Sequence, residues 1–600
     1  MTPPATVLIE TGKQLEDLEK LLVQEPVFAF DTETTGLDWT RSEVFMLSFA
    51  LGDRSWVIPV NRFQGIEKTW LTNFLKIVLR DPTKAVIGHN IKFDMHHVHQ
   101  TFGVPIDRQL HDTLLMGYLL DENRANNLKR LVETVLEMKP LDEKAIHAWM
   151  TEHQGKRENW NFSKVPEAMM VPYAGADPWF TFKLYEKFLP DIETHFKELY
   201  ETERKVLKIM WKMEQNGVRV DVQRLELLCA QHAEKIRTCE NQIYEINGGA
   251  FNYASPIELR KFFYEKLQEP RKFKTKKGED STDEEALRAF KPPAAAVLQV
   301  LRGSKNILDY AEGLRVKQVG GLVHGDYALT RTKTGRFSCS DPNLQNVPKD
   351  KSLRETFIGC PGFDMFFFDH AQIEMVGFAH YSKDPKMMSA LHSGQDLHAL
   401  TAAEVYGVPV EDVTKMQRSV GKGTNFSIIY GVGKAKLASY ISGFMDGMPF
   451  TDAEAAAFKA KYFERFPSVP RFQREAMQAV RTVRIPWKHY IRNQWGRVRR
   501  FDDLSKDYTA VNHLIQGWAP DLMKRGMVLI EERLKPLWRQ NVHDELRIDL
   551  PSSQTGNQRR EMVQEIVRCL THFPEVRVPV NCKVEWSNTN WAEVKKYGNS

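Results

Sequence analysis

Four acidic residues and one tyrosine near the start of the chain suit metal-assisted chemistry on phosphate esters. Asp31 and Glu33 lie two residues apart in FAFDTETTGLD, so a strand would point both side chains to one face. Two carboxylates on one face repel each other unless a cation lies between them. GHNIKFDMHHV adds Asp94, and VPYAGADPWFTF adds Asp177 with Tyr173 on the same face of a predicted helix. Oxygen ligands from three segments suit a pair of Mg²⁺ or Mn²⁺ ions, which can activate water against a phosphodiester.

A second acidic set lies far along the chain. Asp369 follows three phenylalanines in FFFDHAQIEMV, and Glu374 comes five residues later. An apolar, buried run excludes a charge unless something pairs with it. In QNVHDELRID, Asp544 and Glu545 interrupt another apolar run. We therefore predict that Asp369 and Asp544 meet in the folded chain and share Mg²⁺ ions.

A stripe of two cations and two rings lies between these acids. Arg418, Lys422, Phe426 and Tyr430 recur every four residues in QRSVGKGTNFSIIYGVG, so they line one face of a helix. The simpler interpretation is an amphipathic helix with a snorkelling cationic end. The functional interpretation is a triphosphate held by the cations, with a sugar and base against the rings.

These side chains need strands and helices to position them. Residues 5–60 alternate short apolar runs with turns, which predicts strands, and residues 111–190 have a helical pattern. This mixture indicates an α/β region. A long helical pattern follows, broken at NGVRVD, and residues 380–480 are predicted to be mostly helical. Further strands are predicted at LVHGDYAL, MFFFDH, NVHDELRIDL and VPVNCKVEW.

Length and composition indicate a multidomain globular protein. The 600 residues exceed what one hydrophobic core normally spans. The net charge of +5 is only a weak indication of a polyanionic partner. Six cysteines without a CxxC pattern fit a reducing compartment. With no signal peptide and no run of ~18 apolar residues, we expect a cytoplasmic protein without a membrane span.

Two further clusters have simple and functional interpretations. His96, His97 and His99 suggest zinc, but their spacing fits no usual zinc site and no cysteine is near, so structural or surface histidines are expected. Residues 471–500 hold nine Lys/Arg against one acid, with aromatic residues interleaved. That run is either a solvated amphipathic helix or a surface that follows phosphates.

In this order, the first acidic segments resemble the DEDD-type 3′–5′ exonuclease domain, of the subgroup with tyrosine in its third motif. The resemblance covers about residues 5–190 and implies a ribonuclease H-like domain at residues 1–195. It implies that four acids hold the metals and that Tyr173 orients the attacking water. The implied metal ligands are Asp31, Glu33, Asp94 and Asp177.

DHAQIE, RSVGKGTNFSIIYG and VHDE resemble motifs A, B and C of family A DNA polymerases, of the DNA polymerase I type. TKTGRFSCSDPNLQNVP resembles that family's template–primer-binding segment, and GQDLHALTAAEVYG, FPSVP, WGRVRR and NHLIQGWAPDLMKRGM follow in family order. The resemblance implies a right-hand polymerase domain at residues 196–600, within an α/β multidomain chain. The implied parts are a thumb at about 200–320, an antiparallel-sheet palm at about 321–380 and 505–600, and fingers at about 381–504.

The resemblance also implies roles for individual residues in two-metal-ion nucleotidyl transfer. Asp369 and Asp544, with the backbone carbonyl of His370, would hold two Mg²⁺ or Mn²⁺ ions, and Glu545 would support them. Lys422 would also protonate pyrophosphate, while Tyr430 and Glu374 would form a steric gate against a 2′-hydroxyl. The implied dNTP-binding residues are Arg418, Lys422, Phe426, Tyr430, Glu374, His398 and Gln372. The implied DNA-binding residues are Arg336, Asn343, Gln345, Asn346, Asn512, Gln516, His543, Arg497, Arg499 and Arg500.

Motif A departs from the family at three positions. The family pattern DYSQIELR reads DHAQIEMV here, so His370, Ala371 and Val376 replace tyrosine, serine and arginine. The metal and gate positions are kept. We expect the loss of the arginine to affect speed or fidelity rather than the reaction itself.

The predicted function is DNA-templated primer extension with dNTPs, combined with 3′–5′ proofreading. The chain resembles bacteriophage replicases in size, and its exonuclease motif begins by residue 31, with no room ahead for a 5′ nuclease. This predicts phage genome replication in the host cytoplasm, and the alternative is a host-type repair or gap-filling polymerase. A single-subunit RNA polymerase and an inert polymerase half are disfavoured by Glu374 and by the intact motifs. We expect a monomer that binds primer–template DNA and dNTPs, with a processivity factor, helicase or single-strand-binding protein as candidate partners.

Overall fold

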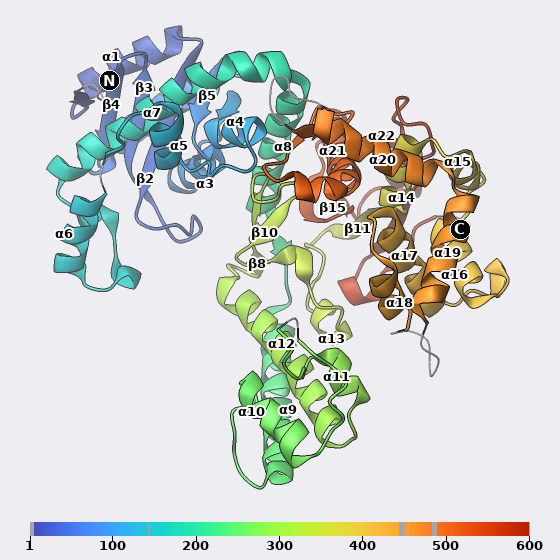
Figure 1. Cartoon of the computed structure of the whole chain (residues 1–600). Coiled ribbons are helices and arrows are strands. Elements are labelled where there is room, and N and C mark those ends of the chain that lie inside the picture. Colours follow the sequence, from blue (N-terminus) through green and yellow to red (C-terminus); the bar gives the residue numbers. More distant parts are fainter. Residues whose placement is uncertain (1–4, 142, 276, 443–449, 483–488, 599–600) are drawn as a thin grey trace.

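The computed structural model describes residues 5–141, 143–275, 277–442, 450–482 and 489–598. The chain passes from an α/β region (blue in Figure 1), through a helical projection (green), into a second α/β region (yellow to red). This arrangement confirms the predicted α/β multidomain fold. Within the described ranges, no helix has both the length and the apolar character needed to cross a bilayer. All six cysteines are free thiols.

The first region is built on a mixed six-stranded sheet with the order β1-β4-β3-β2-β5-β6. Strand β2 lies inside it, antiparallel to β3 and parallel to β5. The strands predicted from the apolar runs are present, but helix α1 separates the first two of them. The strands are β1 (Thr6–Leu8), β2 (Val27–Thr34), β3 (Val44–Leu51), β4 (Arg54–Pro59), β5 (Ala85–Gly88) and β6 (Gln109–Asp112).

Helices cover this sheet, and the alternation of β2 decides which residues meet which helix. Phe28 and Phe30 are buried in a cluster with residues of α1, α2 and α3. Ala29 is buried in a different cluster with Trp179 of α7. The odd-numbered residues of β2 therefore face α7. The helices are α1 (Gly12–Gln24), α2 (Ile66–Leu79), α3 (Ile91–Phe102), α4 (Thr113–Leu120), α5 (Leu128–Val135), α6 (Lys144–Gln154) and α7 (Glu167–His195).

A helical projection follows α8 (Lys197–Asn216). Its two long helices, α9 (Val222–Asn247) and α12 (Ala294–Lys317), pack against each other. The tip of the projection has its own small hydrophobic core, separate from the cores of the two α/β regions. This core includes Phe262, Phe263 and Phe290. The short elements here are β7 (Val218–Arg219), α10 (Pro256–Arg260), the π-helical turn η4 (Lys261–Lys266), α11 (Glu284–Ala289) and β8 (Leu322–Val323).

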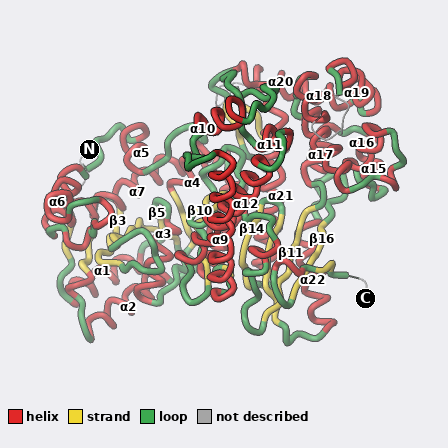
Figure 2. Tube along the Cα trace, turned by 90° about the horizontal axis from the view of Figure 1, so that it is seen from below, coloured by secondary structure: helices red, strands yellow, loops and turns green. Residues whose placement is uncertain are grey.

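The second α/β region contains an antiparallel five-stranded sheet with the order β14-β15-β11-β16-β17. Its central strand, β11 (Phe363–His370), is the predicted phenylalanine run, and Phe366 and Phe368 are fully buried. Figure 2 shows these strands side by side, near α22. The remaining elements are β14 (Leu537–Val542), β15 (Glu545–Pro551), β16 (Cys582–Ser587), β17 (Lys595–Lys596), α21 (Ala510–Arg533) and α22 (Gly556–Thr571).

Among the described residues, seven α-helices follow β11 and precede α21 along the chain, and they lie next to the sheet (Figure 1). The helices are α14 (Ile373–Ser382), α15 (Pro385–His392), α16 (Leu397–Tyr406), α17 (Lys415–Ile429), α18 (Lys434–Ser442), α19 (Asp452–Arg465) and α20 (Ser468–Thr482). The hairpin β12 (Tyr490–Arg492) and β13 (Val498–Arg500) follows. The pair β9 (Asp326–Ala328) and β10 (Ser338–Ser340) and helix α13 (Lys351–Arg354) precede β11.

Short 3₁₀ turns complete the described chain. They are η1 (Val60–Arg62), η2 (Arg157–Asn159), η3 (Phe162–Lys164), η5 (Leu344–Asn346), η6 (Val410–Asp412), η7 (Leu504–Thr509) and η8 (Trp591–Glu593).

Candidate active sites

The first acidic site lies between β2 and α7. The side chains of Asp31 and Glu33 project from the face of β2 that packs against α7. The side chain of Asp177, on α7, lies beside them. One carboxylate oxygen from each of these three residues lies within 4.8 Å of the other two. No second group of this kind occurs among the described residues. Three converging carboxylates are a suitable donor set for a hard divalent cation.

Asp94, the fourth predicted acid, lies just beside this group. It is on α3, is 2% exposed, and accepts a hydrogen bond of 2.6 Å from the Thr32 hydroxyl. Its negative charge contributes to the raised pKa of Asp31. The structure therefore brings three of the four acids into one compact group and places Asp94 against its edge.

Burial and mutual repulsion make these acids weak in the absence of a cation. Burial, followed by the charges of neighbouring acids, raises the pKa values of Asp31 and Glu33 well above their ordinary range. Burial also raises the pKa values of Asp94 and Asp177 to about 7. A bound divalent cation would lower these pKa values because it stabilises the ionised carboxylates. The donor set thus fits a metal ion.

Tyr173 is connected to two residues that the sequence analysis did not identify. Its hydroxyl donates a 2.7 Å hydrogen bond to Oε1 of Glu143, which caps α6. Lys129 of α5 pairs with the same carboxylate and lies 5.2 Å from the centroid of the Tyr173 ring. No motif or local spacing links these positions, because the three residues come from separate helical segments.

Two of the three histidines near Asp94, His96 and His97, are held by contacts within the chain. His96 is 2% exposed, and its ring stacks on Trp39 with centroids 4.6 Å apart. Its Nδ1 accepts from the Gln215 amide at 2.7 Å, so its Nε2–H donates to Glu214 at 2.5 Å. His97 bonds to the backbone carbonyl of Phe93 at 3.0 Å. These contacts tie α3 to its surroundings and leave no zinc-like grouping there among the described residues.

The second acidic site lies at one end of the five-stranded sheet. Asp369, near the end of β11, is opposite Glu545 in the register of β15. The backbone N–H of His370 donates to the carbonyl of Asp544 at 3.1 Å, so the β14–β15 turn lies against the end of β11. His543 holds that turn in a left-handed conformation, with φ of 56°. The predicted meeting of Asp369 and Asp544 therefore follows from strand pairing.

These carboxyl groups are also perturbed by their surroundings. Burial, then the charge of Asp544, raises the pKa of Asp369 to about 6. Burial raises the pKa of Asp544, and it raises that of Glu545 to about 7. As at the first site, close and buried acids favour a cation between them.

Helix α17 presents the predicted stripe beside this second site. Arg418 pairs with Asp396, the N-cap of α16, at 2.5 Å. Lys422 lies 5.7 Å from the centroid of the Phe426 ring, which stacks on Tyr430 with centroids 6.1 Å apart. The helix begins in a capping box at Thr414, so its register is well defined. All four stripe residues lie on one face, as the four-residue spacing predicts.

His398 of α16 belongs to the same face. Its ring lies 5.6 Å from that of Phe426, centroid to centroid. Burial lowers its pKa to about 4, so the ring is neutral near pH 7. The Asn425 amide N–H₂ lies 3.1 Å from Nδ1, which must accept, so Nε2 carries the ring proton and is a donor.

The predicted gate residues are joined in one network. The Tyr430 hydroxyl donates to Glu374 at 3.0 Å, and Arg336 pairs with the other oxygen of Glu374 at 2.5 Å. Arg336 is expected at the DNA, and in this structure its guanidinium pairs with Glu374. Gln372, expected at the dNTP, uses its side-chain oxygen to accept from the Leu397 N–H at 3.0 Å.

Other residues expected at the DNA lie in the second α/β region, around η5 and the N-terminal half of α21. Asn343 caps η5, and Gln345 donates to the side chain of Asn541 at 3.1 Å. Gln516 hydrogen-bonds Tyr430, and its neighbour one turn earlier, Asn512, has a buried side-chain oxygen without a partner. Asn346 ends η5.

Three arginines expected at template phosphates are instead held by acids of the chain. Arg497 is 5% exposed and pairs with Asp521 at 2.6 Å and with Glu203. Arg499 and Arg500 both pair with Glu122, at 2.8 and 2.6 Å. Glu122 comes from the loop between α4 and α5, so these pairs join the two α/β regions. The sequence offered no signal for this, because an isolated acid in a loop is usually only solvated.

Two of the three departures in motif A, His370 and Val376, are buried. His370 is 4% exposed and its Nε2–H donates to the carbonyl of Leu570 at 2.8 Å. Burial lowers the pKa of His370 to about 4, so its imidazole is neutral. Val376 is 1% exposed within an apolar cluster. An arginine there would be buried, and valine fills the position without a charge.

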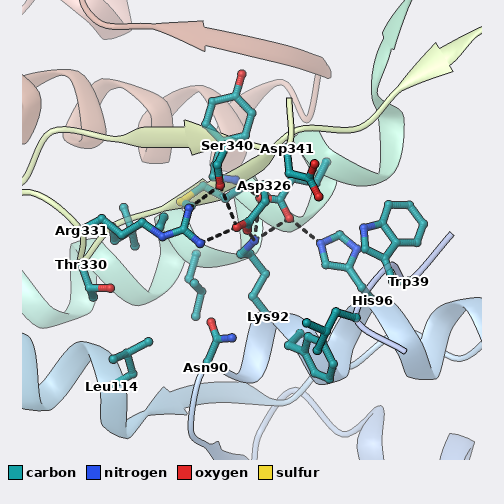
Figure 3. A pocket seen from close by; sticks show the side chains of 18 of the residues that line it. Trp39, Asn90, Lys92, His96, Leu114, Asp326, Thr330, Arg331, Ser340 and Asp341 are labelled. Carbon is teal, nitrogen blue, oxygen red and sulfur yellow. Dashed lines mark hydrogen bonds and ion pairs between the residues drawn. The ribbon is translucent and has the colours of Figure 1, made fainter. Parts of the chain in front are cut away.

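A pocket of about 820 Å³ lies between the first α/β region and the start of the second (Figure 3). Lys92 forms part of the pocket wall, where it pairs with Glu214 at 2.6 Å and with Asp326 at 3.0 Å. Arg331 pairs with the other oxygen of Asp326 at 2.5 Å. These ion pairs connect α3, α8 and β9, so the pocket wall is a second link between the regions.

Comparisons with known proteins agree with this geometry. A family model described as DNA polymerase family A matches residues 222–593, and one described as 3'-5' exonuclease matches residues 6–193. The chain is 30% identical over 569 residues to DNA polymerase I of Pseudomonas aeruginosa, covering 88% of this chain and 60% of that protein. It is 29% identical over 625 residues to DNA polymerase I of Rhizobium leguminosarum, covering 94% of this chain and 59% of that protein. The chain thus spans about 60% of the length of these bacterial relatives.

The fold is also similar to a solved structure, the POL domain of Pol1 from M. smegmatis in complex with DNA primer-template and dNTP. The TM-score is 0.82 at 22% identity, covering 98% of this chain and 99% of that chain. This likeness concerns the fold, and it extends over nearly the whole of both chains.

Proposed function

The chain belongs to DNA polymerase family A, and on this premise we propose that it extends DNA primers with dNTPs and proofreads them by 3′–5′ exonuclease action. The observation that carries the proposal is the presence of two separate acidic sites on two separate sheets. One is Asp31, Glu33 and Asp177 beside α7, and the other is Asp369 with the β14–β15 turn. Only the second lies beside the cationic stripe of α17. Synthesis and hydrolysis thus have separate sites.

At the polymerase site, Asp369, Asp544 and the carbonyl of His370 are the proposed metal ligands, with Glu545 in support. Divalent cations such as Mg²⁺ or Mn²⁺, two for each active site, would neutralise charge on the reacting phosphates and make the primer hydroxyl more acidic. Arg418 and the Nε2–H of His398 bind the triphosphate from one side. Lys422 lies near enough to Asp369 and Asp544 for its charge to oppose the rise of their pKa values, and it would protonate the departing pyrophosphate.

The sugar of the incoming nucleotide is proposed to lie against Phe426. The Tyr430–Glu374 hydrogen bond would then close the space beside C2′, which excludes ribose. Gln372 supports this site through the start of α16.

At the exonuclease site, Asp31, Glu33, Asp94 and Asp177 are the proposed ligands of a second pair of divalent cations, and Tyr173 orients the attacking water. The raised pKa values of these acids support a site that needs a cation to be fully ionised.

The proposed DNA contacts separate into base-pair and phosphate groups. Minor-groove contacts would use acceptors that all base pairs share, which checks shape without reading sequence. The proposed residues are Arg336, Asn343, Gln345, Asn346, Asn512, Gln516 and His543. For Arg497, Arg499 and Arg500, phosphate contact requires release from Asp521, Glu203 and Glu122 first.

The proposed domains are an exonuclease at residues 1–195 and a polymerase at 196–600. The thumb is proposed at about 200–320, the palm at about 321–380 and 505–600, and the fingers at about 381–504. We propose a cytoplasmic monomer whose partners are primer–template DNA, dNTPs and a processivity factor, helicase or single-strand-binding protein. Phage genome replication and host-type repair are the two candidate roles, and the relatives reported above are bacterial proteins.

The test is extension of a primed long template, with a matched or a mismatched primer 3′ end. The wild-type protein should extend both, removing the mismatch first. Asp369→Ala and Asp544→Ala should abolish extension but keep 3′ nuclease activity, while Asp31→Ala should do the reverse. The exposed Asp412→Ala is the matched control. Extension that survives Asp369→Ala would refute the assigned site, and long uninterrupted products would favour replication over repair.

A further inference from the structure

Glu143 is the acceptor for the one hydrogen that the Tyr173 hydroxyl can donate. The two oxygens are 2.7 Å apart, and the second carboxylate oxygen of Glu143 lies 3.8 Å from Nε2 of His147. A phenol has a single O–H donor but can still accept through its oxygen. The same hydroxyl also lies near Asp177 and lowers the pKa of that acid. When its hydrogen is given to Glu143 at 2.7 Å, the phenol oxygen is an acceptor toward a water molecule.

Lys129 fixes the carboxylate of Glu143 in this place. It pairs with Glu143 and also lies over the face of the Tyr173 ring, so one cation touches both partners. Burial alone would raise the pKa of Glu143, but the hydrogen bonds from Lys129 and Tyr173 outweigh it and lower that pKa. Glu143 is therefore ionised and a strong acceptor near pH 7.

The arrangement lies directly beside the acidic group of β2 and α7. Tyr173 is one helical turn before Asp177 on α7, so its ring and the Asp177 carboxylate share a face. The charge of Glu143 contributes to the raised pKa values of both Glu33 and Asp177. Glu143 therefore adds a negative charge beside three crowded carboxylates, and its ion pair with Lys129 keeps that charge in place.

We infer that Glu143 is a positioning residue of the exonuclease site. It holds the Tyr173 hydroxyl so that the phenol oxygen accepts a hydrogen bond from the attacking water, which turns a water lone pair toward the phosphorus. In the hydrolysis the water oxygen forms the new P–O bond and gives up one proton, the P–O3′ bond breaks, and the departing 3′-oxygen takes up one proton. Glu143 touches neither water nor phosphate and acts through Tyr173. The inference rests on the proposed exonuclease function.

The test is a double-mutant cycle on degradation of a 5′-labelled single-stranded DNA in Mg²⁺, with kcat and KM measured separately. Glu143→Ala and Tyr173→Phe should each lower kcat, by between about 10- and 100-fold, with little change in KM. The double variant should be no slower than the slower single variant, because both changes remove the same alignment. Glu143→Gln, which keeps an acceptor oxygen, should recover most of the lost kcat.

Glu152→Ala, an exposed acid on the same helix, is the matched control and should behave as wild type. Primer extension and thermal unfolding by the same samples report whether each variant is folded. The inference is overturned if Glu143→Ala keeps or raises the wild-type kcat, or if the two single losses multiply in the double variant. A wild-type protein without nuclease would overturn the proposed exonuclease itself, which is a distinct outcome.

Discussion

Glu374 contacts two residues, Tyr430 and Arg336, for which the sequence predicted separate roles, one at the dNTP and one at the DNA. It accepts the Tyr430 hydroxyl at 3.0 Å and pairs with Arg336 at 2.5 Å. Tyr430 ends α17, whereas Arg336 precedes β10, so Glu374 connects the dNTP face to the segment expected at the primer. Glu374, a proposed gate residue, is therefore held from two directions.

The first prediction concerns this gate. Glu374→Ala should raise the ratio of ribonucleotide to deoxyribonucleotide incorporation by about 10-fold or more, because Tyr430 loses its acceptor and space opens beside C2′. Single-nucleotide incorporation rates with each nucleotide measure the ratio. Glu411→Ala, an exposed acid, is the control. An unchanged ratio with intact dNTP incorporation would rule out this gate.

The second prediction concerns metal removal at the exonuclease site. Asp94 and Asp177 have pKa values raised to about 7 in the fold, so the metal-free folded chain binds more protons than the unfolded chain. Their stabilising contribution is present below the ordinary pKa of about 4 and is lost as pH rises through about 7. A cation needs the ionised carboxylates, so it should restore stability mainly at the higher pH.

Thermal unfolding in a chelator or in Mn²⁺, at pH 5 and at pH 8, measures this. The Mn²⁺-induced rise in Tm should be larger at pH 8, and Asp177→Asn should reduce it. An equal Mn²⁺ effect at both pH values would contradict the raised pKa values.

At the scale of elements, the close packing of α16 on α17 places the side chains that we propose face the dNTP. A Cβ at Gly421 would lie 2.2 Å from the carbonyl oxygen of His398 and 2.8 Å from the backbone nitrogen of Ala402. Only glycine allows this approach, because both obstacles are backbone atoms. The same contact sets the distance of His398 on α16 from Phe426 on α17.

The third prediction follows from that contact. Gly421→Ala should force α16 and α17 apart, lowering stability by about 1–3 kcal/mol and slowing dNTP incorporation more than exonuclease action. Gly433→Ala is the matched control, since a Cβ there meets nothing within 4 Å. Chemical denaturation and the two activities, measured on one preparation, give the result. A Gly421→Ala variant with wild-type stability and incorporation would show that the helices can readjust freely.

At the scale of the whole molecule, the two α/β regions are joined by buried charges. Glu122 of the first region is 3% exposed at its side chain and pairs with Arg499 and Arg500 of the second. Lys92 of α3 pairs with Glu214 of α8 in the wall of the pocket (Figure 3). A cluster of basic residues predicted to bind phosphate thus serves partly to hold the exonuclease region in place.

The fourth prediction concerns this junction. Glu122→Ala should lower the free energy of unfolding by about 3–5 kcal/mol, because it leaves two largely buried arginines without their acid. Hydrogen exchange should quicken around residues 118–126 and 490–500 together. Glu133→Ala, an exposed acid paired with Arg130, is the control and should change little. If exchange quickens on one side only, the junction does not depend on Glu122.

Local periodicity was enough to predict much of this protein from its sequence. The alternation of β2 predicted that Asp31 and Glu33 share a face, and the four-residue spacing of α17 predicted its stripe. Both follow from the repeat of the backbone itself, which needs no information about distant residues. The pairing of Asp369 with the β14–β15 turn was also predicted, because isolated acids in apolar strands need a partner.

Tertiary structure alone decided which distant side chains complete these sites. It brought Glu143 and Lys129 to Tyr173, Arg336 to Glu374, and Glu122 to the arginines of β13. Each of these contacts joins segments whose separation along the chain has no fixed period. The hydrogen-bonded repeats of helices and strands fix only near neighbours, whereas contacts across elements depend on how whole elements pack.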